Sequence, residues 1–552
     1  MKGAVIRLSA SVACDVLVLG SGIAGLQAAL AAASAGRHVV LASRGPIFSG
    51  SSFYPGTWGL GLIGPEQESD RADLAASILE VGRGMADPDL VSSFVDGISP
   101  AVESLIRMGV RLKEASAREE REFIPCFDHK HRAWHGLLFQ SVREVFTREL
   151  ERHRVTLLPG LELLELTQSD GRVNGAVLGN AGGLFWIPCG AVVLATGGLG
   201  GLYQHRLTTD DVGSSAHFLA CQAGAELINL EFMQIMPGYL HPCPKTIFNE
   251  KTFRWVRLLD PRGEDILSQI PEAQALLEQR SGHGPFTSRL ADREIDLSIL
   301  RHQGEAGVTV QYSPALKRHM PEFVATYFQW LASERGVQLD DPVQIGLFAH
   351  ASNGGLRIDP HGFTGVPGLY AAGEVTGGMH GADRIGGLST ANGLVFGGRA
   401  GAAAAESCSP PSARSWVEFD GWRIPDAERR LFDLRQQMTR HALVLRRREG
   451  LEQALIHLRA LAGEAVFQPC RTPGECVLSR RVLAQLGTAQ CVLMAQLLRQ
   501  ESRGSHYRAD FPSEHPALAR RIVVRLSHTT PEAVYEAPST GKECPLRFGT
   551  MR

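Results

Sequence analysis

The chain has 552 residues, which exceeds what one hydrophobic core usually supports, so two or three structural units are expected. Its 56 Lys and Arg residues against 58 Asp and Glu residues give a formal charge of -2, which argues against nucleic acid and favours small molecules or other proteins as partners. Ten cysteines without a C-x-x-C pair predict reduced thiols in a cytoplasmic protein and no metal, iron-sulfur or c-type haem site.

The first predicted unit is a strand, a glycine turn, a helix and a second parallel strand. Residues 15–19 (DVLVL) are typical of a short buried strand, and residues 20–25 read GSGIAG. An alanine-rich helix is expected over residues 26–35, followed by a strand over residues 38–42. This order within fewer than about 30 residues is typical of the beginning of a dinucleotide-binding fold.

The three glycines of GSGIAG each have a structural reason to be there. Gly20 permits the turn, Gly22 lets the backbone approach a pyrophosphate, and Gly25 lets the helix pack on the strand. The alternative for the apolar run over residues 12–36 is a targeting peptide or a membrane span. Glycines at a strand-to-helix turn favour the dinucleotide site, so no membrane span is expected.

The middle of the chain contains several predicted elements. Residues 70–153 have the apolar spacing of helices, the last of which begins near Ser141. Residues 155–190 alternate short apolar runs with turn signals, which predicts an antiparallel layer. Residues 191–198 are typical of a buried strand that ends in glycines. From about residue 233 to 342 the composition becomes mixed and irregular, which indicates an inserted domain.

The nucleotide-binding fold is expected to resume after the insertion and to end before a linker. Residues 409–412 read SPPS and are the clearest linker signal in the chain. Helices are predicted over residues 426–461 and 479–499. The charged run RRRE at residues 446–449 is interpreted as a solvated helix face; nucleic-acid binding is the alternative, but no aromatic residues interleave the run.

The residues that follow the second strand carry a family resemblance. The acid that usually holds a ribose there is replaced by Ser43 and Arg44, in SRGP, and residues 50–54 read GSSFY. These stretches resemble the family that contains L-aspartate oxidase and the fumarate reductase and succinate dehydrogenase flavoproteins. The resemblance continues in order through residues 194–198 (LATGG), 229–234 (NLEFMQ), 290–294 (LADRE), 350–397 and 501–508 (ESRGSHYR).

The resemblance implies an FAD cofactor. A histidine binds FAD covalently in membrane-bound relatives, and its position here is Ser51, so a non-covalent FAD is expected. Glu374, in AGEV, would hold a ribose hydroxyl; its alternative is an acid that only interacts with a helix dipole. The residues expected at the cofactor are Gly20, Gly22, Ile23, Ala24, Gly25, Ser43, Arg44, Gly50, Ser51, Ser52, Trp58, Gly59, Ala195, Thr196, Gly197, Glu374, Arg384, Ser389 and Thr390.

The resemblance also implies roles for substrate-site residues. His350 and Arg384 would bind a substrate carboxylate, the arginine with two donors; a core histidine is the alternative for His350. Arg293 would handle the substrate proton, with Glu294 or Glu250 as the carboxylate relay that an arginine needs because of its high pKa. The alternative for Arg293 and Glu294 is an ordinary surface ion pair.

The chain departs from the family pattern at the substrate. The histidine of EFxQFHPT, which contacts a second carboxylate, is Met236 here, and a thioether cannot pair with that group. The glutamate that receives the substrate ammonium in L-aspartate oxidase falls at Cys126. Flavin-facing AQGG has become PGTW, which places Trp58 near the isoalloxazine, and a GDG is GSS at residues 213–215. The altered pocket leaves room for a substrate that is not a dicarboxylate.

The expected fold is α/β, with three domains. A Rossmann-like FAD-binding domain occupies two segments, residues 12–232 and 343–407. An inserted α+β capping domain covers residues 233–342, and a C-terminal helical domain covers residues 413–552.

The expected function is that of an FAD-dependent oxidoreductase. It would transfer a hydride between flavin N5 and a small-molecule carboxylate. A separate electron acceptor is needed, such as dioxygen, a quinone or a carrier protein, because no second dinucleotide motif is present. The alternative is a flavoprotein subunit of a larger electron-transfer complex whose own catalysis has diverged or been lost.

Overall fold

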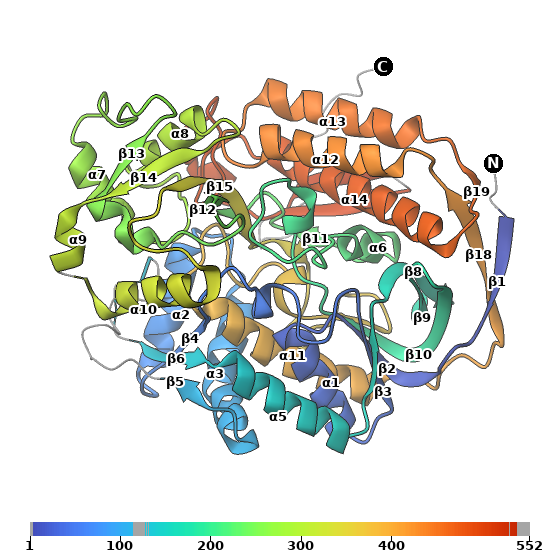
Figure 1. Cartoon of the computed structure of the whole chain (residues 1–552). Helices are drawn as coiled ribbons and strands as arrows, with labels where there is room; N and C mark the ends of the chain where they lie inside the picture. Colours follow the sequence, from blue (N-terminus) through green and yellow to red (C-terminus); the bar gives the residue numbers. More distant parts are fainter. Residues whose placement is uncertain are drawn as a thin grey trace.

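The structure is a computed structural model, and it describes residues 4–113, 127–128, 130, 132–318, 320–528 and 530–537. Figure 1 shows an α/β part around α1 and α11, a green to yellow part around β13 and β14, and a part built from the long helices α12, α13 and α14. The α/β class expected from the sequence is confirmed.

The central sheet of the α/β part is mostly parallel. Its order is β7 (Thr156–Pro159), β3 (Val39–Ser43), β2 (Cys14–Leu19), β10 (Leu184–Leu194), β9 (Arg172–Gly179) and β8 (Glu162–Ser169), and β17 (Leu369–Ala371) also pairs with β10. The end of β10 runs parallel to β2, whereas its beginning runs antiparallel to β9. The predicted strands and the antiparallel layer are therefore confirmed. Val16, Leu17 and Val18 are fully buried at the centre of this sheet.

Two helices with small side chains pack together on this sheet. The helix α1 (Ile23–Ser34) follows the glycine turn, as predicted, and α11 (Leu388–Ser407) lies against it. A Cβ on Gly401 would lie 2.2 Å from the Ala28 carbonyl oxygen, so only glycine permits this approach. The close contact fixes the N-terminal ends of both helices relative to the strands.

The inserted segment contains a second sheet. Its order is β12 (Met233–His241), β15 (Val343–Ser352), β14 (Val308–Tyr312) and β13 (Val256–Leu259), with helices α7 (Ala273–Arg280), α8 (Arg293–His302), α9 (Pro314–Arg318) and α10 (Glu322–Trp330). The division expected between residues 342 and 343 falls within this sheet, because β15 pairs with both β12 and β14. A change of composition marks where the irregular segment ends, but it carries no information about which strands pair.

The C-terminal part is helical, as expected, but strands connect it to the rest. Its helices are α12 (Ala427–Ala442), α13 (Arg448–Gly463) and α14 (Pro473–Leu498). The strand β18 (Trp416–Arg423) pairs with β1 (Ala4–Ser9), and β20 (Ile522–Ser527) pairs with β11 (Leu227–Ile228) and β21 (Thr530–Tyr535). Other elements are β4 (Leu60–Gly64), α2 (Asp70–Val81), α3 (Pro88–Met108), β5 (Leu112–Lys113), β6 (Ala133–Leu137), α5 (Phe139–Arg152), α6 (Ala216–Gln222), β16 (Gly355–Leu356) and β19 (Gln468–Pro469).

The expectation of a solvated helix face over residues 446–449 is wrong for its first residue. Arg446 is fully buried and lies between α12 and α13 rather than on an exposed face. Its guanidinium donates to the carbonyls of Ala442 and Leu443, at 2.9 and 3.0 Å, and to that of Glu231 at 3.0 Å. A helix end leaves carbonyls without partners, and an arginine there satisfies them.

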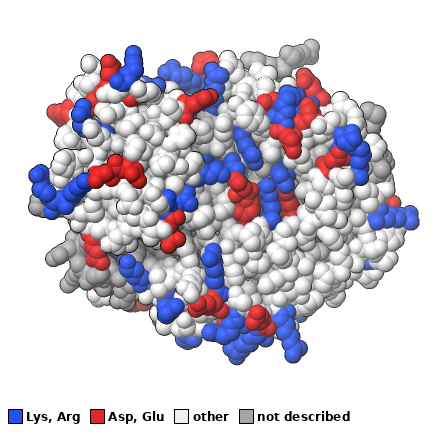
Figure 2. All heavy atoms as spheres, viewed as in Figure 1, with Lys and Arg blue, Asp and Glu red and all other residues white. Residues whose placement is uncertain are grey.

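Figure 2 shows that basic and acidic side chains are interspersed on the face of the molecule that it presents.

The buried histidine of α6 makes stability sensitive to acid. His217 is 0% exposed, and burial lowers its pKa to about 4. Unfolded histidine titrates near pH 6.5, so between about pH 6.5 and 4 the unfolded state binds more protons and stability falls as the pH falls. This histidine alone is expected to cost about 3 kcal/mol near pH 4. We expect His217→Gln to flatten the pH dependence of the urea unfolding midpoint, and an unchanged slope would contradict this.

Candidate active site

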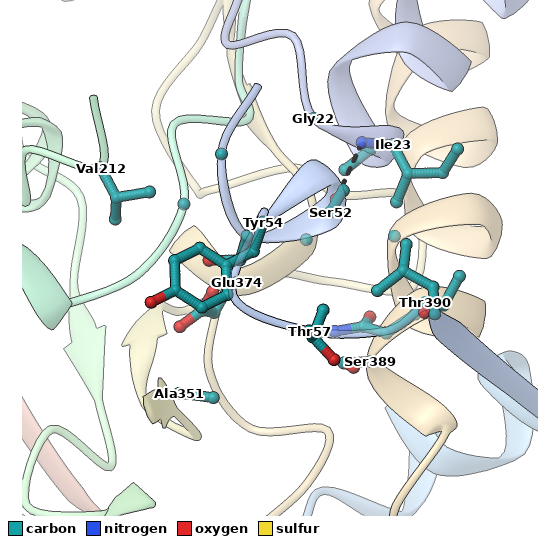
Figure 3. A pocket seen from close by; sticks show the side chains of 18 of the residues that line it. Gly22, Ile23, Ser52, Tyr54, Thr57, Val212, Ala351, Glu374, Ser389 and Thr390 are labelled. Atoms are coloured by element: carbon teal, nitrogen blue, oxygen red, sulfur yellow. Dashed lines mark hydrogen bonds between the residues drawn. The ribbon is translucent and has the colours of Figure 1, made fainter. Parts of the chain in front are cut away.

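A cavity of about 480 Å³ lies where the α/β part meets the inserted segment. Its wall is formed by the carboxyl ends of β2, β3 and β10, the beginnings of α1 and α11, the loop before β4, and strands β12 and β15. Ligands of open α/β sheets usually bind at the carboxyl ends of the strands. Figure 3 shows part of this wall.

The N-terminal ends of two helices face the cavity. Gly22 precedes α1, and the backbone N–H of Ile23 donates to Ser52 Oγ at 3.1 Å, as the dashed line in Figure 3 marks. Ser389 and Thr390 lie in the first turn of α11. A helix N-terminus attracts negative charge through its unpaired N–H groups, so a phosphate or an electron-rich ring edge fits here.

A half-buried acid lines the same cavity as these two helix ends. Glu374 follows β17, and its Oε1 accepts a hydrogen bond from the backbone N–H of Ser352 at 3.0 Å. Burial raises the pKa of Glu374 above its usual range. A Cβ at Gly198 would lie 2.2 Å from Oε1, so the glycine makes room for this carboxylate. The second strand carries no acid, and Glu374 supplies one at the end of another strand of the same sheet.

The far end of the cavity contains Ser43 and Arg44. Ser43 Oγ accepts from Ser21 Oγ at 2.9 Å. Arg44 Nε lies 3.5 Å from a carboxylate oxygen of Glu162, and Arg44 Nη1 is buried without a hydrogen-bond partner among the described residues. A buried donor without a partner is costly, so this nitrogen is placed to meet a ligand atom.

Nearly all residues predicted for the cofactor line the cavity. Gly25 does not, because it packs against the strand: its Cβ would lie 1.8 Å from the Gly20 carbonyl oxygen. Those that do are Gly20, Gly22, Ile23, Ala24, Ser43, Arg44, Gly50, Ser51, Ser52, Trp58, Gly59, Ala195, Thr196, Gly197, Glu374, Arg384, Ser389 and Thr390.

An anion-binding group of side chains lies at the other end. Arg384 is only 9% exposed, and its Nε donates to Gln234 Oε1 at 2.8 Å. His350, on β15, lines the same cavity; burial, and to a lesser extent the charge of Arg384, lower its pKa to about 3. The ring is therefore neutral at physiological pH and retains one N–H that can donate. Arg384 and His350 can together bind a carboxylate.

The predicted proton-handling residues are divided between the cavity wall and its surroundings. Glu250 lines the cavity and is 9% exposed. Arg293 and Glu294 do not line it: Arg293 Nη1 donates to the Ser288 carbonyl at 2.9 Å, and Arg293 Nε lies 3.7 Å from Glu294 Oε1. That Nε is buried without a hydrogen bond to any described residue. Cys126 lies outside the described residues.

The inserted segment is fastened to the loop that carries the anion-binding arginine. Asp383 is fully buried, and its Oδ2 accepts from Thr287 Oγ1 at 2.8 Å and from Arg289 Nε at 2.9 Å. Ser288 Oγ donates to the Gly504 carbonyl at 2.9 Å. These contacts hold the segment that precedes α8 against both other parts of the chain.

One part of the remaining wall is apolar. Met236, 6% exposed, packs with Tyr54, Leu207, Ile247 and Phe348. The ring centroid of Trp58 lies 5.6 Å from that of Phe323, which also lines the cavity, and 4.8 and 6.2 Å from those of Tyr327 and Trp330, which do not. This wall offers a substrate tail apolar and aromatic contacts.

Comparison with known proteins agrees with this geometry. The family model described as "FAD binding domain" matches residues 15–390, and the one described as "Fumarate reductase flavoprotein C-term" matches residues 432–532. The L-aspartate oxidase of Mycobacterium tuberculosis H37Rv is 32% identical over 93% of this chain and 95% of its own length. The chain belongs to the L-aspartate oxidase and fumarate reductase family of flavoproteins. It is an FAD-dependent oxidoreductase.

Other members of this flavoprotein family are similar over comparable lengths. A fumarate reductase (CoM/CoB) subunit from Methanothermobacter marburgensis is 28% identical, covering 93% of this chain and 97% of its own. Mycobacterium smegmatis Sdh1, solved with UQ1, superposes with a TM-score of 0.77 at 22% identity, over 95% and 94% of the two chains. The E. coli quinol fumarate reductase FrdA chain gives 0.75 at 20%, over 97% and 98%. These structures show the fold alone.

The cavity of this flavoprotein fits FAD by its own contacts. A Cβ at Gly20 would lie 2.2 Å from the Ala195 carbonyl oxygen, which leaves space only for backbone beside the pyrophosphate position. Two buried polar atoms of the wall, Arg44 Nη1 and Thr196 Oγ1, have no hydrogen-bond partner among the described residues. Among the described residues of the whole chain, no helix is long and apolar enough to span a membrane. No group of three or more potential metal ligands is found among them.

Two residues of the flavoprotein's anion-binding end were not predicted from the sequence. Gln234, which holds Arg384, belongs to a stretch that carried the resemblance, and it lies two residues from Met236 on β12. The period of two along a strand could have placed both side chains on one face. His380 also lines the cavity, and it too belongs to a stretch that carried the resemblance, residues 350–397.

Proposed function

We propose that this flavoprotein oxidises or reduces a C–C or C–N bond beside a carboxylate, with a hydride passing between the substrate carbon and flavin N5. FAD, when bound, supplies the hydride chemistry, and the chain supplies binding and orientation. The observation that carries the proposal is the position of Arg384, which is buried, held by Gln234 and on the wall of the same cavity as the FAD residues. A cytoplasmic location fits the eight described cysteines, all free thiols.

The chain orients the substrate through three side chains. Arg384 binds the carboxylate, and His350 donates one hydrogen bond to it from a neutral ring. Gln234 holds Nε of Arg384 and so fixes the plane of the guanidinium. Orientation of this kind, rather than affinity alone, is what brings the reacting carbon to the flavin. The acceptor of the electrons is proposed to be dioxygen, a quinone or a carrier protein.

We propose Arg293 for the substrate proton and Glu250 for its carboxylate relay. Arg293 lies outside the cavity lining with Nη1 bonded to the Ser288 carbonyl, so the proton role requires it to exchange that bond for the substrate, while Glu250 already lines the wall. The ion pair of the alternative is present, at 3.7 Å between Arg293 Nε and Glu294 Oε1; the support for the proton role is that this Nε has no hydrogen bond to any described residue. An arginine without strong partners is free to change its contacts.

Arg293→Ala is expected to lower kcat by at least about 100-fold, because it removes the group that exchanges the proton. FAD content should stay unchanged. Arg301→Ala is the matched control, since Arg301 Nη2 lies 3.6 Å from the same Glu294 and the residue is on the outer turn of α8. Steady-state turnover with an active carboxylate checks this. Equal activities of the two variants would rule out the proton role.

The substrate tail is proposed to be something other than a second carboxylate. Gln234 and Met236 both line the cavity and lie two residues apart on β12, about 6–7 Å along the strand. A carboxylate held at the Gln234 end would therefore place its tail near Met236 and the Trp58 wall. Neither side chain can neutralise a buried carboxylate there.

Met236→His is expected to tighten succinate binding by about tenfold, because it adds a donor to a charged acceptor. The matched control is Met236→Leu, which keeps the wall apolar and should leave binding unchanged. The dissociation constant of succinate is read from the perturbation of the flavin spectrum. If histidine and leucine give the same value, the second carboxylate does not approach this position.

The second candidate is a flavoprotein subunit whose own catalysis has been lost. The observation that favours it is the similarity to the fumarate reductase (CoM/CoB) subunit of Methanothermobacter marburgensis, together with the altered wall at Met236. Adding a panel of carboxylates to the purified protein without oxygen separates the two. Bleaching or reoxidation of the flavin by any of them supports the enzyme, and silence across a broad panel supports the second candidate.

A further inference from the structure

The loop before α11 carries a second group that faces the anion-binding end. His380 precedes Arg384 by four residues, lines the same cavity and is 7% exposed. Burial, and then the positive charge of Arg384, lower its pKa well below the usual range. The ring is therefore neutral at physiological pH, on the wall of the cavity that Arg384 also lines.

The backbone of His380 is held in place, but its ring is not. A Cβ at Gly381 would lie 2.6 Å from the Cα of Gly82, so this loop is packed directly against the one at residues 82–86. By contrast, no described residue forms a hydrogen bond with the ring. Its Nδ1 is fully buried without a partner, whereas Nε2 is not fully buried and is the ring nitrogen that can reach the cavity. Buried polar groups are nearly always bonded, so an unbonded imidazole at a cavity wall indicates a ligand that it meets.

We propose that His380 is a further substrate-binding residue that donates a hydrogen bond to the carboxylate held by Arg384. This inference rests on the proposed function. A neutral imidazole has one N–H to give, and an ionised carboxylate has about four acceptor positions. Two donors from the arginine and one from His350 leave a position for His380. The residue therefore completes the set of donors around the carboxylate.

The proposal explains why a histidine, rather than a lysine or a phenylalanine, suits this position. A lysine would place a second permanent charge beside Arg384 in a buried site, which is costly without a ligand. A phenylalanine would fill the space but leave one carboxylate position without a donor. A neutral imidazole avoids both effects.

The test uses the purified FAD-loaded protein and three probes, acetate, hexanoate and succinate. Their dissociation constants are read from the flavin difference spectrum at a pH of about 7.5, where an unperturbed histidine is also neutral. We expect His380→Phe to weaken the probes that bind by about tenfold or more, with FAD content unchanged. His361→Phe is the control, because His361 is an exposed histidine of a neighbouring loop.

Two further variants keep the test decisive if the phenylalanine variant does not fold. Glutamine places an amide near the Nε2 position and should restore most of the affinity, whereas asparagine places it near Nδ1 and should not. Probe affinities within twofold of wild type in His380→Asn and His380→Phe would overturn the role of His380 and leave the proposed function standing. If the wild-type protein binds none of the probes, both proposals fail together.

Discussion

Replacing Arg384 by leucine is expected to lower kcat/KM by about a thousandfold or more and to leave folding intact. Removing one partner of a buried, hydrogen-bonded charge pair costs about 4–5 kcal/mol, much of it because the other charge is left buried and unpaired. Arg384 is 9% exposed and bonded to Gln234, so its loss would leave the substrate carboxylate in a buried position without its charged partner. The measurement is steady-state kinetics with the carboxylate that reduces or reoxidises the flavin.

Arg384→Lys separates charge from geometry in the same experiment. Lysine retains the positive charge but cannot present two parallel donors, so we expect it to recover only part of the loss. FAD content serves as the control, because Arg384 also lies among the residues expected at the cofactor. A leucine variant with wild-type kcat/KM would show that the substrate carboxylate binds elsewhere.

Local sequence rules predicted the strands, the turn and the helix that begin the cavity wall. The GSGIAG turn, its flanking strands and α1 are determined by residues within about one supersecondary unit, and they lie where the motif predicts. The same holds for the α/β class. A backbone requirement such as the turn at Gly20 restricts the position to glycine, so it can be recognised from the sequence without a structure.

The differences between expectation and structure involve contacts between distant segments. The division near residue 343 falls within a sheet because the pairing of β12 with β15 joins segments about a hundred residues apart, and composition does not record pairing. Arg446 was interpreted as solvated because a run of charges usually is, but its position between two helices gives it buried carbonyl partners. His380 lies in a stretch that carried the resemblance, but only the fold shows that it is on the cavity wall.

The substrate half remained a prediction for a related physical reason. Specificity depends on which side chains face one another across the cavity, and Met236, Trp58 and Arg384 come from three separate segments. A single altered position, such as Met236, shows that the pocket has changed. It does not show what the aromatic side chains of Trp58 and Phe323 contribute.

Replacing Gly20 by alanine is expected to abolish FAD binding. Gly20 has φ of 109°, and its Cβ would lie 2.2 Å from the Ala195 carbonyl oxygen, which is backbone and cannot rotate away. Relief requires β2 and β10 to separate at their carboxyl ends, where the pyrophosphate position lies. A left-handed conformation adds about 1 kcal/mol for any residue with a side chain.

Gly36→Ala is the matched control for this last experiment. Gly36 also has a positive φ, 80°, but nothing lies within 4 Å of its Cβ position, so alanine there bears only the conformational cost of about 1 kcal/mol. We expect Gly36→Ala to retain a full complement of flavin, measured as visible absorbance per chain after gel filtration, and Gly20→Ala to retain almost none. A methyl group at position 20 and the Ala195 carbonyl cannot occupy the same space, so alanine must displace this turn. Full flavin occupancy in Gly20→Ala would therefore mean that the pyrophosphate does not contact the turn.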